Sequence, residues 1–224
     1  MKKNRFQLLL GTLLAILVLA GSTSVFAYIM GNDAPVAFNS PLKSAESGSA
    51  MTLEQYVVSG AGYYLDSYSD FVLLLNRVEL WDSKTYGFNE LQILVDGALT
   101  KMKNAGQTYS GLVETADATL YNEIAVAKLE SLDYKAFRVA KGLNSEIFDE
   151  VEADLSKGNI RAIFHRLKSD VENISVKLNL LKEEIEANKF PSIPLLWEIN
   201  SQYAQTLLYG QYAAQVFNSI KQEM

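Results

Sequence analysis

Apolar side chains recur every three or four positions through most of the chain beyond residue 50. This spacing is typical of helices that bury one face, whereas half-buried strands alternate apolar and polar residues. Prolines interrupt that part of the chain only at Pro191 and Pro194. The pattern therefore predicts an all-α fold, an antiparallel helical bundle of five to six helices.

Breaks in the apolar spacing set the expected bounds of these helices. The predicted helices are Thr52–Trp81, Phe88–Ala105, Leu112–Lys141, Ser145–Lys157, Ile160–Asn188 and Pro194–Gln222. Residues 106–111 are interpreted as a loop, because Gly106 is a usual helix stop; a kinked continuation through Gly106 is the alternative. The strongest periodic signal is a run of heptads in the fifth helix, formed by Phe164, Leu167, Val171, Ile174, Leu178, Leu181 and Ile185.

Capping signals support several of these starts. Thr52 precedes Gln55 by three residues, as in a capping box, and Asn144 and Asn159 are placed to cap the fourth and fifth helices. Glycine in the run Gly60-Ala61-Gly62 predicts close approach of a second helix, with a kink as the alternative.

The first 27 residues have the layout of an export signal. Met1–Arg5 is positively charged, Leu8–Ala20 is a continuous apolar run, and Ser22–Ala27 is small and polar. Cleavage is predicted after Ala27, which leaves Tyr28 as the mature N-terminus. The alternative is an uncleaved anchor formed by residues 6–30, a length that could span a bilayer. Both interpretations place the folded part outside the cytoplasm, in the periplasm or secreted.

The remainder divides into two parts. Residues 28–50 are rich in Gly, Pro, Ser and Asn and have no useful periodicity, so they are predicted to form a flexible linker. Residues 51–224 form the predicted bundle domain. Membrane contact is expected only through an uncleaved N-terminal anchor.

Charge narrows the range of partners. The chain carries 20 basic and 26 acidic residues, a net charge of −6. The predicted signal holds three of the basic residues and no acid, so its removal leaves 17 basic and 26 acidic residues, a net charge of −9. Such a surface repels phosphate backbones, which argues against nucleic acid as a partner.

The chain lacks the residues that many catalytic and metal sites require. It has no cysteine, which excludes disulfides, thiolate metal sites, iron–sulfur clusters and cysteine nucleophiles. The single histidine, His165, falls at an outward heptad position, and a di-iron bundle would need two Glu-x-x-His motifs. No nucleophile elbow or phosphate-binding glycine loop occurs. We therefore expect no metal, no cofactor and no catalytic residue.

Twelve tyrosines are the unusual feature of the composition. Several crowd the first and last predicted helices, and tyrosine combines an apolar ring with a hydroxyl that requires a partner. Tyr63, Tyr209 and Tyr212 are therefore candidates for a ligand pocket between these two helices. An ordinary core whose hydroxyls reach the rim is the alternative.

Two apolar residues lie on the wrong side of the fifth helix. At 100° per residue, Val176 and Leu180 fall almost opposite the heptad seam, among polar neighbours. Either the fourth or the last helix covers them, or they are exposed and form a candidate partner surface.

Together these features predict an exported, non-enzymatic helical bundle that acts as a binding or adaptor module for a protein partner at the cell envelope. The alternative is a small-organic-ligand-binding protein that uses the tyrosine-rich pocket. A hydrolase that acts through carboxylates alone ranks third.

Overall fold

A computed structural model describes residues 51–79 and 87–222 of the chain, and this part is all-α. It contains seven helices and no strand within those ranges. The helices are α2 (Leu53–Glu79), α3 (Phe88–Ala118), α4 (Glu123–Ser131), α5 (Tyr134–Lys141), α6 (Ser145–Leu155), α7 (Ile160–Glu186) and α8 (Ile193–Gln222). The predicted signal, its cleavage site at Ala27 and Tyr28, and the linker lie outside the described residues.

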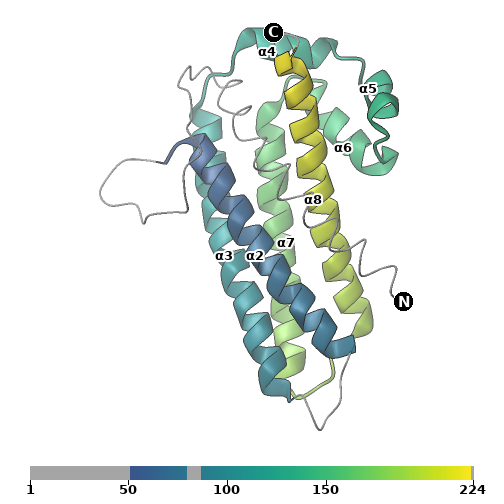
Figure 1. Cartoon of the computed structure of the whole chain (residues 1–224). Helices are drawn as coiled ribbons and strands as arrows, with labels where there is room; N and C mark the ends of the chain where they lie inside the picture. Colours follow the sequence, from purple (N-terminus) through teal and green to yellow (C-terminus); the bar gives the residue numbers. More distant parts are fainter. Residues whose placement is uncertain (1–50, 80–86, 223–224) are drawn as a thin grey trace.

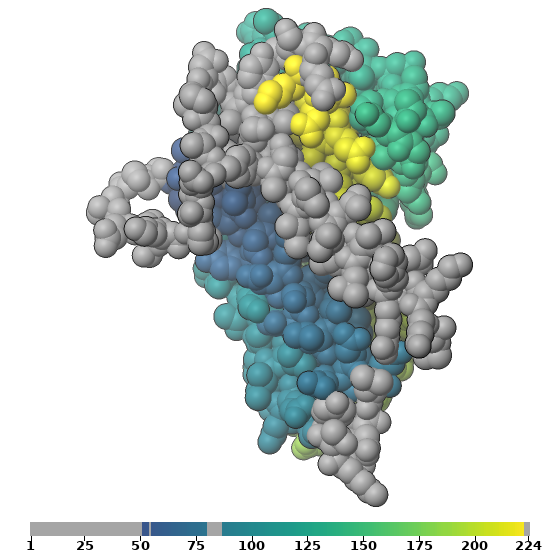
Figure 2. All heavy atoms as spheres, in the orientation of Figure 1, coloured from purple at the N-terminus to yellow at the C-terminus, as the bar shows by residue number. Residues whose placement is uncertain are grey.

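Four long helices, α2, α3, α7 and α8, run along the length of the molecule, and α4 to α6 lie together at one end (Figure 1). The neighbouring long helices pack as α2 on α3, α3 on α7, and α7 on α8. Figure 2 shows that α4 to α6 gather beside the C-terminal half of α8. Of the three short helices, α6 packs against both α7 and α8.

Contacting pairs show that neighbouring long helices are antiparallel. Between α7 and α8, Lys177 pairs with Glu198, whereas Asp170 meets Thr206 farther along α8. The same reversal relates α3 and α7, where Asp96 pairs with Lys182 and Asp117 contacts His165. Between α2 and α3, the ring of Tyr109 lies 3.0 Å from where a Cβ on Gly60 would be, a close approach that the glycine run predicts, and farther along α2 Asp70 pairs with Lys101 earlier in α3.

Several predicted helix starts are confirmed by their caps. The side chain of Asn144 accepts a hydrogen bond from the Ile147 amide at the start of α6, and Asn159 accepts one from Ala162 at the start of α7. Thr52 and Gln55 exchange the two bonds of a capping box. Each bond satisfies an amide that the first helical turn leaves unpaired.

Two predicted boundaries are wrong. Residues 106–111 belong to α3, a single 31-residue helix, so the alternative of a continuation through Gly106 is correct. Gly106 lies against the Val171 side chain of α7, so packing between helices overrides the glycine stop signal. The predicted helix Leu112–Lys141 is instead divided, because Asn122 caps α4 and Asp133 caps α5.

Tyrosines of α2 and α8 pack together in the core. Tyr203 stacks on Tyr68 and Phe71, with ring centroids 4.8 Å and 5.4 Å away. Its hydroxyl lies 2.6 Å from Ser67 Oγ, which in turn donates to the Ala98 carbonyl of α3. The Tyr64 hydroxyl donates to the Tyr203 carbonyl. These hydroxyls are satisfied inside the protein, as buried polar groups require.

None of the helices in residues 51–79 and 87–222 combines the length and the apolar character needed to cross a membrane.

Candidate functional site: a polar cleft between α6, α7 and α8

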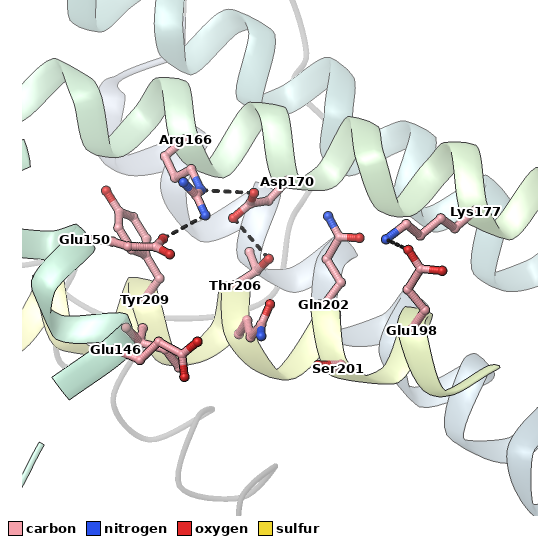
Figure 3. Close-up of a pocket in the computed structure, with 12 residues that line it drawn as sticks. Glu146, Glu150, Arg166, Asp170, Lys177, Glu198, Ser201, Gln202, Thr206 and Tyr209 are labelled. Carbon is pink, nitrogen blue, oxygen red and sulfur yellow. Dashed lines mark hydrogen bonds and ion pairs between the residues drawn. The ribbon is translucent and has the colours of Figure 1, made fainter. Parts of the chain in front are cut away.

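A cleft of about 400 Å³ opens where α6 lies across α7 and α8 (Figure 3). Its lining is mostly polar and comes from all three helices. The lining residues are Glu146, Ile147 and Glu150 of α6, Arg166, Asp170 and Lys177 of α7, and Glu198, Ser201, Gln202, Gln205, Thr206 and Tyr209 of α8. This volume lies within the range of small-molecule sites.

Aromatic packing holds α6 in the position that forms one wall. Phe148 is fully buried and lies between Phe137 of α5 and Tyr212 of α8, with ring centroids 5.9 Å and 6.3 Å away. The Tyr209 hydroxyl donates to Asp154 at 2.6 Å and ties α8 to the opposite end of α6. Because Phe148 points into this aromatic layer, Ile147 and Glu150 on the same helix are turned toward the cleft.

Arg166 organises the charges at the α6 end of the cleft. Its guanidinium lies 2.7 Å from Glu150 and 3.1 Å from Asp170. Thr206 donates a second hydrogen bond to Asp170, at 3.2 Å. Asp170 is buried, and this burial raises the pKa of its carboxyl, although Arg166 and Thr206 act in the opposite direction. Burial therefore disfavours the charged form of Asp170, and the contacts with Arg166 and Thr206 partly offset this desolvation cost.

Four lining side chains lack such partners within the described residues: Glu146, Ser201, Gln202 and Gln205. Gln202 lies between the Asp170 end and the Lys177–Glu198 ion pair, and its side-chain oxygen is buried without a hydrogen bond. Glu146 makes no ion pair or side-chain hydrogen bond within the described residues, whereas Arg166 and Lys177 are both engaged in ion pairs. Because an acceptor without a donor is unfavourable, the Gln202 oxygen would gain from a donor supplied by solvent or by a ligand.

The structure separates the three predicted pocket tyrosines. Tyr209 lines the cleft, whereas Tyr212 is buried beside it and its hydroxyl accepts a hydrogen bond from the Asn144 amide. Tyr63 is half-buried on α2 and is not among the lining residues. The tyrosines that α2 and α8 bring together are Tyr64, Tyr68 and Tyr203, which are buried. Tyr64 also lines a second, mostly apolar pocket of about 40 Å³ between α2 and α8.

The outer face of α7 carries the second predicted surface. Val176 is 59% exposed and Leu180 is 47% exposed, so the alternative that another helix covers them is wrong. Their role as a partner surface stays a prediction. His165 is also exposed, and its Nε2 lies 3.2 Å from Asp117. Within residues 51–79 and 87–222, no group of three or more His, Asp or Glu side chains is placed to hold a metal ion.

Sequence reasoning missed the charged lining of the cleft. Asp170 is the residue that could have revealed the cleft from the sequence. It lies only about 70° from the centre of the buried heptad face of α7, where a charged side chain is unexpected. Arg166, one turn earlier, is its natural partner. Glu146 and Gln202 gave no signal, since each has an ordinary place on a polar helix face.

In comparisons with known proteins, no family model, curated protein or solved structure matches the chain.

Proposed function

We propose that the protein is an exported, non-enzymatic binding protein whose cleft between α6, α7 and α8 takes up a small polar ligand. The observation that carries this proposal is a polar cleft of about 400 Å³ formed by three helices, whose lining includes side chains without protein partners, among them Gln202 and Glu146. Ligand sites commonly present a few polar groups whose partners the ligand supplies.

The nature of the lining favours binding over catalysis. Arg166 and Lys177 are held in ion pairs with Glu150, Asp170 and Glu198. The single imidazole of the chain, His165, lies on the exposed side of α7 and is not part of the lining. Export is proposed from the residue pattern of Met1–Ala27.

A panel of small polar compounds tests this function. The panel comprises amines, amino acids, dicarboxylates, sugars and nucleosides, and at least one member is expected to raise the thermal midpoint. A ligand present at 100 times its Kd stabilises the folded state by about 2.7 kcal/mol. Gln205→Trp, at an exposed lining position, should fill the cleft and abolish the shift while the domain stays folded.

The matched control is Gln107→Trp, which places the same side chain at an exposed position of α3 outside the cleft. This variant should respond to the panel like the wild type. The proposal fails if no compound raises the midpoint, or if Gln205→Trp responds as strongly as the control.

The second candidate function is that of an adaptor for a protein partner at the cell envelope. The observation that favours it is the exposure of Val176 and Leu180, one turn apart on α7. Apolar side chains at such positions gain little within the monomer and are suited to burial by a partner.

A double change separates this candidate from a chance pair of apolar residues. Val176→Asp combined with Leu180→Lys should change the free energy of unfolding by no more than about 1 kcal/mol, because both side chains are exposed. Proteins that co-purify with the wild type from envelope extract should be lost. Leu120→Lys with Val139→Asp, at other exposed apolar positions, is the control. Retention of every partner by the folded α7 variant would exclude this surface.

A further inference from the structure

We infer that the ligand of the cleft is a linear molecule with two or more ammonium groups; this inference rests on the function proposed above. Three features of the cleft point to this class: the balance of its charges, the kind of group left without a partner, and its length.

The charges of the lining do not cancel. Four carboxylates, those of Glu146, Glu150, Asp170 and Glu198, face two cationic side chains, those of Arg166 and Lys177. With all six groups ionised the lining carries a formal charge of −2, and both cations already contact carboxylates. A cationic ligand would neutralise this excess, whereas an anionic ligand would add to it.

Two of the lining groups without partners are acceptors, whereas Ser201 and Gln205, which also make no side-chain hydrogen bond within the described residues, carry donors as well. The Gln202 oxygen is buried and accepts no hydrogen bond, and the Glu146 carboxylate lacks a cation. An ammonium group has three donors and no acceptor, so it complements both. Glu146 belongs to the α6 wall and Gln202 to the α8 wall, so two separate ammonium groups would engage them without displacing an existing ion pair (Figure 3).

The cleft is long compared with its volume. The lining runs from Arg166 to Lys177 along α7 and from Tyr209 to Glu198 along the antiparallel α8. Eleven residues of helix rise by about 16 Å, so about 400 Å³ is distributed along an extended groove. A thin, flexible chain fits this shape better than a bulky ring system.

Calorimetric titration with four-carbon probes of matched length tests the ligand class. 1,4-Diaminobutane should bind. Succinate, which carries two carboxylates, and 1,4-butanediol, which carries two hydroxyls, should not bind. Spermidine, with a longer chain and a third amine, should bind more tightly than 1,4-diaminobutane because it reaches more of the groove.

Variants locate the binding. Gln202→Leu should weaken spermidine binding about tenfold to a hundredfold, the loss expected for one hydrogen bond to a charged group. The thermal midpoint of this variant without ligand should stay the same or rise, because an unsatisfied buried acceptor is removed. Glu146→Gln should weaken binding about two- to fivefold. Glu183→Gln removes one exposed charge of α7 outside the cleft and should change the affinity less than about twofold.

The outcomes distinguish the two proposals. If succinate or 1,4-butanediol binds and Gln202→Leu abolishes that binding, the ligand class is wrong and the cleft remains a binding site. If spermidine binds wild type and Gln202→Leu equally, it occupies another part of the acidic surface and the inference is overturned. If neither these probes nor the broader panel binds, both the inference and the proposed function are overturned.

Discussion

Tyr203→Ala is expected to lower the free energy of unfolding by about 3–5 kcal/mol, the usual cost of removing a fully buried aromatic ring. The ring stacks on Tyr68 and Phe71, and its hydroxyl bonds to Ser67, so its loss opens a cavity between α2 and α8. Urea unfolding followed by circular dichroism measures the change.

Tyr203→Phe is the control for this variant. It keeps the ring and removes only the hydroxyl, and Ser67 retains its bond to the Ala98 carbonyl, so the cost should be about 1 kcal/mol. If Tyr203→Ala lowered the free energy of unfolding by less than about 1 kcal/mol, the Tyr203 ring would not be packed in the core. A tyrosine-lined pocket between the first and last helices would then regain support.

Phe148→Ala should cost a similar amount, about 3–5 kcal/mol, and should act mainly on the end of the molecule that carries the cleft. The ring joins α5, α6 and α8 through Phe137 and Tyr212. Its removal should loosen α6, which forms one wall of the cleft. Hydrogen exchange should therefore accelerate in α5 and α6 more than in α2 and α3.

Val139→Ala on α5 is the control, because Val139 is 72% exposed and its truncation should change the free energy of unfolding by less than about 0.5 kcal/mol. If hydrogen exchange in the Phe148→Ala variant accelerated equally in all helices, α6 would open only when the whole domain unfolds. In that case Phe148 would not be what positions the cleft wall.

Local signals were sufficient for much of the fold. The heptads of α7 predicted its buried face, where Phe164, Val171 and Leu178 are fully covered. Asn144 and Asn159 correctly predicted helix starts, because each side chain accepts a hydrogen bond from an amide only three residues later. The failures came where contacts distant in sequence decide the structure, as at Gly106, which packs on Val171 in α7.

The cleft could not be predicted in the same way. Its walls exist only because α6 folds across α7 and α8, and the pairing of Arg166 with Glu150 joins residues sixteen positions apart through that turn. Gln202 is distinguished by having no partner, a property of its surroundings rather than of its sequence. The sequence predicts Tyr209 as a pocket residue, and Tyr209 does line a cavity, although that cavity lies between α6, α7 and α8 instead of between α2 and α8.

A cysteine footprint tests most directly whether the cleft is the binding site. The chain has no cysteine, so Ser201→Cys introduces a single thiol at the exposed edge of the cleft, and Ser169→Cys places one on exposed α7 surface outside it. The rate of thiol modification is measured for each variant with the panel compound that raises the midpoint most, at ten times its Kd. We predict that modification of Ser201→Cys slows about tenfold, as expected for that occupancy, while Ser169→Cys reacts at an unchanged rate. An unchanged rate at Ser201→Cys under saturating compound would contradict the account.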